Sequence, residues 1–128
     1  MSEVMDSFHR ARKRELAERF YEIFLDADPR FRPMFKHTDF TRQKELLTHS
    51  IMMLLEYSDG KATGKMAIDR LAELHSRKRM NIEEDMYPIW MDCLMKAVAK
   101  TDPQFSPDLE KKWRNSLQKG ITVMISRI

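Results

Sequence analysis

Hydrophobic residues recur along the chain every three to four positions, which is the spacing of one face of an amphipathic helix. The first such row and its neighbour contain Leu16, Ala17, Phe20, Tyr21 and Phe24. Proline lacks a backbone N–H and restrains the residue before it, so the segment DADPRF (26–31) is predicted to end this helix. A short helical turn that carries Phe31, Met34 and Phe35 is expected next.

Four further apolar rows follow with the same period. They are Leu47, Ile51, Leu54 and Leu55; Ala67, Ile68, Leu71, Leu74 and His75; Tyr87, Trp90, Met91, Leu94 and Val98; and Leu109, Trp113, Leu117, Ile121, Met124 and Ile128. The segments SDGKATG (58–64) and TDPQFSP (101–107) separate rows, and Ser106 followed by Pro107 is typical of an N-cap and a first helical residue. No period-two run or internal repeat is present. The pattern therefore predicts an all-α chain of about six or seven helices that forms one domain over residues 1–128.

Charge and composition narrow the classes of function. The 23 Lys and Arg residues are interspersed with 20 Asp and Glu residues, so the net charge of +3 is spread along the chain. Nucleic-acid binders concentrate cations on one face, and we therefore expect no nucleic-acid partner. No apolar run is long enough to span a membrane and no apolar signal core occurs, so a cytoplasmic protein without membrane contact is expected. The single cysteine, Cys93, is expected in the core.

Most familiar catalytic motifs are missing from the chain. It has no glycine-rich phosphate loop, nucleophile elbow, HExxH zinc motif or paired-cysteine pattern. Met52, Met53, Met91 and Met95 lie on or beside apolar rows, as flexible core residues do. Four histidines remain, and no two of them have the i, i+3 or i, i+4 spacing of a zinc site on one helix. These histidines are His9, His37, His49 and His75.

His75 differs from the other histidines because it continues the apolar row of Leu71, so its ring is expected to point inward. An inward imidazole needs a hydrogen-bond partner or a metal. A haem iron needs only one axial protein ligand and leaves the opposite position open for a gas. Arg77, Lys78 and Arg79 follow within one turn, where cations could meet the haem propionates. Periodicity alone leaves both this interpretation and an ordinary core or surface histidine open.

Five segments in a fixed order carry a resemblance to a known family. They are RFYEIFLDADPRFRPMF (19–35), RQKELL (42–47), LAELH (71–75), NIEEDMY (81–87) and FSPDLEKKW (105–113). The chain resembles bacterial single-domain globins from Phe8 to Met124, and its pattern is similar to that of the haem domain of flavohaemoglobins. The resemblance implies a globin fold, a three-over-three helical sandwich with a shortened N-terminal helix. It also implies haem b, iron protoporphyrin IX, as the cofactor.

The resemblance assigns a role to individual residues. His75 matches the proximal iron ligand, and Tyr21 and Gln43 match the polar pair on the opposite, distal side. Phe35 matches the phenylalanine that packs against the porphyrin, and Leu47 matches the apolar residue that flanks the bound gas. The remaining haem contacts that we expect are Arg77, Arg79, Ile82 and Tyr87.

Three departures from the flavohaemoglobin pattern are visible. Few residues precede Phe8, and the loop between Phe35 and Gln43 is short. The family's late glutamate, which hydrogen-bonds the proximal histidine, is replaced by Ile128. The reductase domain of flavohaemoglobins is missing from the chain.

The resemblance implies a haem protein that binds O2, and also NO and CO, at a histidine-ligated iron. Two distal donors, Tyr21 and Gln43, would each form a charge-assisted hydrogen bond worth roughly 1.5–3 kcal/mol, so high oxygen affinity is expected. Tightly held oxygen suits a nitric oxide dioxygenase that depends on an external reductase. A haem-based gas or redox sensor and a haem-free helical interaction module are the alternatives. Tyr21 or His37 as an internal sixth ligand, the physiological gas and the oligomeric state stay open.

Overall fold

The computed structural model describes residues 2–74 and 82–126, and all regular structure in them is helical, as the sequence predicts. The helices are α1 (Glu3–Arg12), α2 (Leu16–Phe24), α3 (Phe31–Met34), α4 (Phe40–Ser58), α5 (Ala62–Leu74), α6 (Met86–Thr101) and α7 (Pro107–Ile125). None of these helices is both long and apolar enough to cross a membrane.

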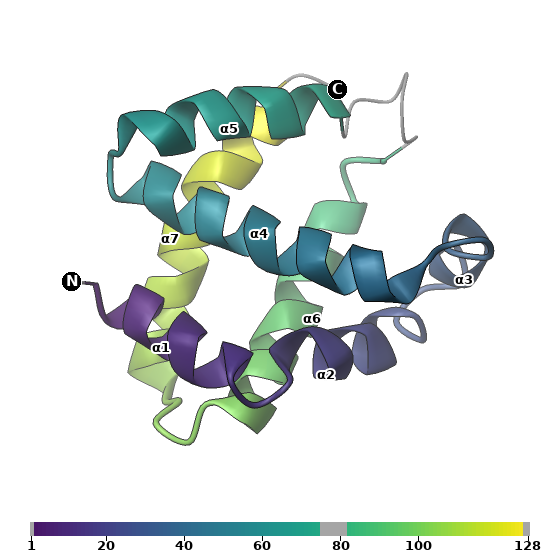
Figure 1. Cartoon of the computed structure of the whole chain (residues 1–128), viewed down its shortest axis with the longest axis horizontal. Helices are drawn as coiled ribbons and strands as arrows, with labels where there is room; N and C mark the ends of the chain where they lie inside the picture. The colour runs from purple at the N-terminus through teal and green to yellow at the C-terminus, as the bar shows by residue number, and fades with distance from the viewer. Residues whose placement is uncertain (1, 75–81, 127–128) are drawn as a thin grey trace.

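The helices pack in two crossing groups (Figure 1). α4 and α5 run alongside each other, and α7 crosses behind both of them. α1 and α2 follow each other along the lower edge in Figure 1, and α6 runs behind them. The short α3 projects at one end of the molecule, beyond the end of α2 and the start of α4. The apolar rows face the space between the two groups.

Capping side chains define where several helices begin and end. The side chains of Ser2, Asp39 and Ser106 each accept a hydrogen bond from a backbone N–H in the first turn of α1, α4 and α7. Ser106 and Pro107 therefore start α7 as predicted. After α4 the chain turns at Gly60, whose φ of 79° is a left-handed conformation that glycine adopts without steric cost. This is the predicted break in SDGKATG.

The predicted apolar rows form the core. Phe20, Ile51, Leu94 and Trp113 are almost fully buried, and Cys93 is buried as expected. Gly64 lets α5 approach the end of α4, because a Cβ atom at this position would lie 2.7 Å from the backbone carbonyl carbon of Glu56. Any larger residue there would push α5 away from α4.

A buried polar cluster, which we call the Asp102 cluster, joins α1 to the corner between α6 and α7. Ser7 Oγ donates to Asp102 Oδ2 at 2.5 Å and accepts from Trp113 Nε1 at 2.9 Å. Arg10 donates Nε and Nη2 to the two Asp102 oxygens at 2.7 and 3.0 Å, and the Gln104 N–H donates to Oδ1 at 2.9 Å. Burial alone would raise the pKa of Asp102, but the hydrogen bonds from Arg10, Ser7 and Gln104 outweigh it and lower the pKa. The cluster thus holds the carboxylate ionised.

Candidate functional site

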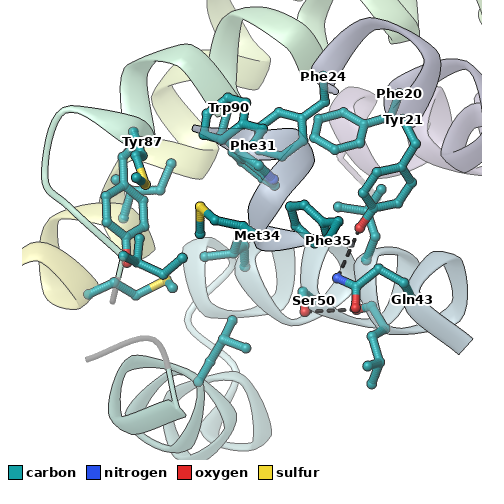
Figure 2. A pocket seen from close by; sticks show the side chains of 18 residues that line it. Phe20, Tyr21, Phe24, Phe31, Met34, Phe35, Gln43, Ser50, Tyr87 and Trp90 are labelled. Carbon is teal, nitrogen blue, oxygen red and sulfur yellow. Dashed lines mark hydrogen bonds between the residues drawn. The ribbon is translucent and has the colours of Figure 1, made fainter. Parts of the chain in front are cut away.

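A cavity of about 250 Å3 lies between α2, α3, α4, α5, α6 and α7 (Figure 2). Its walls are mostly apolar, and they include the aromatic side chains of Phe20, Phe24, Phe31, Phe35 and Trp90. Aliphatic side chains from α4, α5, α6 and α7 complete the walls, among them Leu47, Leu54, Leu71, Met86, Ile121 and Met124. An apolar cavity with a few polar groups is the usual form of a small-molecule site.

One wall of the cavity is a stack of aromatic rings. The rings of Phe24 and Phe31 are nearly parallel, with centroids 4.0 Å apart and planes at 16°. Phe20 stacks on the other side of Phe24 at 4.9 Å, and Trp90 meets Phe20 edge-on at 6.1 Å. Stacked and edge-on ring pairs are favourable arrangements of aromatic side chains. This wall is therefore a closely packed aromatic cluster.

A paired tyrosine and glutamine form the polar side of the cavity. Gln43 Nε2 donates a hydrogen bond to Tyr21 Oη at 3.1 Å, which brings α4 and α2 together (Figure 2). Burial raises the pKa of Tyr21 to about 12, although the bond from Gln43 lowers it. The phenol is therefore neutral at ordinary pH. Since its oxygen acts as the acceptor for Gln43, the Tyr21 hydroxyl hydrogen remains available to donate to another group.

A second tyrosine lies on the opposite side of the cavity from Tyr21 (Figure 2). The hydroxyl of Tyr87 is buried, and it has no hydrogen-bond partner within the described residues. Burial raises the pKa of Tyr87 to about 12. A buried hydroxyl without a partner costs about 1–3 kcal/mol, so most such groups in folded proteins are paired. An occupant of the cavity that accepts a hydrogen bond would remove this cost.

The cavity has an open side between α3 and α4. Met34 and Leu46 line it, yet their exposed fractions are 37% and 47%. Large apolar side chains that are exposed at the rim of an apolar cavity commonly mark a binding site. The cavity is therefore reached from solvent at this edge.

The structure brings together six residues that the sequence analysis selected, namely Tyr21, Phe35, Gln43, Leu47, Ile82 and Tyr87, all of which line the cavity. His75, Arg77 and Arg79 lie outside the described residues, as do Lys78 and Ile128. Leu71, one turn before position 75, lines the cavity. His37 is exposed.

Sequence reasoning missed Leu46 and Ser50 in the lining. Both lie on α4 at three and seven positions after Gln43, so they share its helix face. Extending the face from Gln43 rather than from Leu47 alone would have identified them.

Titratable side chains offer no alternative cofactor site in the described part of the chain. Residues 2–74 and 82–126 contain no group of three or more histidine, cysteine, aspartate or glutamate side chains that could hold a metal ion. The cavity thus remains the principal candidate for a functional site.

Comparison with known proteins identifies one informative neighbour among solved structures. The crystal structure of the protein PA3967 from Pseudomonas aeruginosa PAO1 is described as structurally highly homologous to a human haemoglobin. It is 34% identical to this chain, covers 97% of this chain and 94% of its own, and superposes with a TM-score of 0.91. No family model and no curated protein matches the chain. The alignment therefore includes nearly the whole of both chains and all helices around the cavity.

Proposed function

The chain belongs to the globin family, and from this premise we propose that its cavity binds haem b and, through it, a diatomic gas. The expected all-α globin fold is confirmed by the same relationship. The observation that carries the proposal is the cavity itself, which has an apolar lining rich in aromatic rings and hydroxyl groups on two opposite sides.

The described lining fits a flat, largely apolar macrocycle. The stacked rings of Phe20, Phe24 and Phe31 line the cavity with apolar side chains, and Phe35 and Leu47 extend this lining. His75 would supply the imidazole nitrogen that binds iron, since it follows the cavity-lining Leu71 by one helical turn. Arg77 and Arg79 would pair with the propionates. The roles of His75 and the two arginines rest on the sequence and on the family.

Haem b would supply an iron that coordinates O2, NO or CO, which no protein side chain can do. The residues of the chain would then hold and orient the gas. The Tyr21 hydroxyl would donate to a gas ligand that carries partial negative charge, and Gln43, which donates to the phenol oxygen, would fix the direction of this donation. Such a bond is worth roughly 1.5–3 kcal/mol, so it slows oxygen loss about ten- to a hundredfold.

Tyr21 and Gln43 are not two independent donors, because they are hydrogen-bonded to each other. One Gln43 N–H donates to Tyr21 Oη, so Gln43 would act on Tyr21, and Tyr21 would act on the gas. This relay favours tight, oriented oxygen over rapid release. We therefore propose that the reaction is nitric oxide dioxygenation with a separate reductase. We also propose that the Tyr87 hydroxyl donates a hydrogen bond to a group on the proximal side, the side of His75.

Two substitutions test the proposal, one at the expected iron ligand and one at the expected oxygen donor. His75→Ala should abolish most haem retention, and His49→Ala, on the exposed face of α4, is the matched control. Tyr21→Phe should keep haem but accelerate oxygen dissociation at least tenfold by stopped-flow absorbance. Tyr57→Phe is its control, because Tyr57 lies at the end of α4 outside the cavity lining. Normal haem spectra in His75→Ala would contradict the iron-ligand assignment.

The reaction requires its own test. Mixing the oxygenated protein with NO should form nitrate rapidly, and Tyr21→Phe should form it with lower yield, because it loses oxygen before NO arrives. Slow or absent nitrate formation would remove the dioxygenase proposal and leave gas binding or sensing. A wild-type protein without any Soret band would leave the haem-free interaction module.

A further inference from the structure

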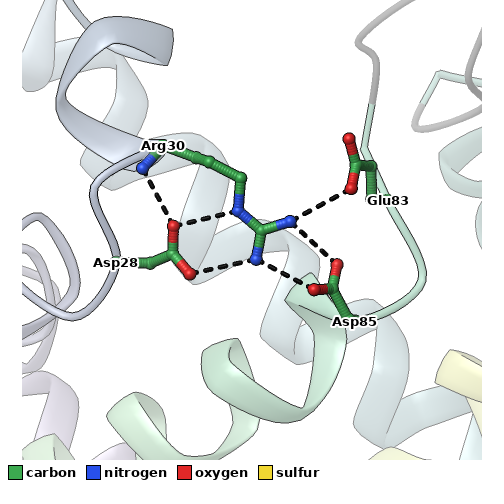
Figure 3. Close-up of polar contacts among 4 residues, drawn as sticks. All are labelled: Asp28, Arg30, Glu83 and Asp85. Carbon is green, nitrogen blue, oxygen red and sulfur yellow. Dashed lines mark hydrogen bonds and ion pairs between the residues drawn. The ribbon is translucent and has the colours of Figure 1, made fainter.

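One arginine links two walls of the cavity that are far apart in sequence (Figure 3). Arg30 lies in the turn before α3, and its guanidinium reaches Asp85 and Glu83, the last residues before α6. The residues next to Arg30 in the chain include Phe31 and Met34, which line the cavity. Ile82, Met86 and Tyr87, the neighbours of the two acids, line it from the other side.

Arg30 forms two bidentate pairs, one with Asp28 and one with Asp85, rather than a single contact. Arg30 Nε and Nη2 donate to the two oxygens of Asp28 at 2.9 and 3.0 Å. Nη1 and Nη2 donate to the two oxygens of Asp85 at 2.9 and 3.1 Å, and Nη1 also donates to Glu83 Oε2 at 3.1 Å. The Arg30 backbone N–H donates to Asp28 as well. Bidentate pairs fix orientation as well as distance, and only a planar guanidinium can form two at once.

Little else holds α3 against α6. α3 has four residues, and the extensive helix contacts among the described residues are made by other pairs. Phe31 anchors α3 in the core through its ring, and within the described residues Arg30 makes the hydrogen bonds and ion pairs that join the α3 corner to the segment before α6. The arginine also separates three carboxylates that would otherwise repel one another. Loss of Arg30 would therefore both release and push apart the two walls.

We propose that Arg30 is a positioning residue for the cavity, which holds the start of α6 against the α3 corner so that a bound cofactor is retained. This inference rests on the proposed haem binding. Arg30 touches no cofactor in this account and acts through Phe31 and Met34 on one side and through Ile82, Met86 and Tyr87 on the other.

The experiment compares Arg30→Gln with two controls in the full-length chain. Arg32→Gln removes the same charge from the same corner, but Arg32 is exposed and, among the described residues, pairs with the nearby Asp26. Ser7→Ala weakens the Asp102 cluster at the distant end and lowers global stability without touching the cavity. Arg30→Lys keeps the charge but cannot form both bidentate pairs.

The first readout is hydrogen exchange of the haem-free protein. Amides from 82 to 90 should exchange about tenfold faster in Arg30→Gln than in the wild type and in Arg32→Gln. The second readout is the rate of haem transfer to an excess of a haem-scavenging protein. This rate should rise about tenfold in Arg30→Gln, by less in Arg30→Lys, and less than twofold in both controls.

The outcomes separate the possibilities. Unchanged exchange at 82–90 would overturn the inference, as would a rate of haem transfer in Arg30→Gln no faster than in Ser7→Ala. If the wild type binds no haem, the proposed function fails, and exchange alone decides whether Arg30 holds this wall: faster exchange supports the positioning role, and unchanged exchange overturns it.

Discussion

The Asp102 cluster and the cavity differ in whether their buried polar groups have hydrogen-bond partners. In the Asp102 cluster, Ser7, Arg10, Trp113 and the carboxylate form a closed set of hydrogen bonds. In the cavity, the Tyr87 hydroxyl has no partner within the described residues, and Tyr21 keeps its hydrogen free to donate. Saturated groups stabilise a fold, whereas groups that are left open beside a cavity can be completed by a ligand.

The comparison predicts that the two ends are separable by mutation. Changes in the Asp102 cluster should alter the free energy of unfolding and leave the cavity's affinity unchanged in the folded molecules. Changes in the cavity should alter binding, and some should even stabilise the empty protein. The largest effects are expected at the closed cluster.

Asp102→Ala should cause the largest loss of stability. It leaves the buried Ser7 hydroxyl without its acceptor, and it removes both contacts of Arg10 and the bond from the Gln104 N–H. Because Arg10 is partly exposed and can turn to water, we expect a loss of about 3 kcal/mol rather than more. Urea unfolding of the haem-free protein measures this.

The control is Asp92→Ala, which breaks the exposed pair with Arg114 and should cost less than about 1 kcal/mol. Equal losses in the two variants would mean that the cluster contributes no more than a surface ion pair. A changed haem affinity in folded Asp102→Ala would mean that the two ends are not separable.

The pH dependence of stability gives a second, smaller effect at the same end. The folded-state pKa of Asp102 is lowered, so the carboxylate stabilises the fold above its unfolded pKa of about 3.9. This contribution is lost as the pH falls below about 4 and through the lower folded pKa. The stability difference between the wild type and Asp102→Asn should therefore shrink in acid. A difference that is constant from pH 7 to about pH 3 would contradict an ionised Asp102.

Tyr87→Phe should have the smallest effect and the opposite sign. Removing this hydroxyl, which has no partner in residues 2–74 and 82–126, should stabilise the haem-free protein by about 1 kcal/mol in urea unfolding. With the cavity filled, the same substitution should lose a hydrogen bond and reduce or reverse the gain. Tyr57→Phe serves as control and should be close to neutral in both states. A loss of stability in haem-free Tyr87→Phe would show that the hydroxyl already has a partner.

Local features of the fold were predictable from the sequence. Four predicted apolar rows lie on α2, α4, α6 and α7; they begin at Leu16, Leu47, Tyr87 and Leu109. Ser106 is the N-cap of α7, as the sequence predicts. Such features depend on residues within one or two helical turns. The fold family followed from the resemblance and not from periodicity.

Long-range pairs could not be predicted in this way. Tyr21 and Gln43 are 22 positions apart, and spacing alone gives no reason to pair them; the family resemblance placed both on one side of the haem. Arg30 and Asp85, 55 positions apart, and Arg10 and Asp102, 92 positions apart, have no sequence signal at all. Each is an ordinary charged residue until the helices bring its partner close.

The most direct test of the central claim is a titration of the purified full-length protein with haem, followed by its Soret absorbance. We predict saturable binding of one haem per chain, and a shift of the Soret band when CO is added to the reduced protein. Absorbance that rises in proportion to added haem without saturation, as for free haem, would show that the cavity does not hold this cofactor.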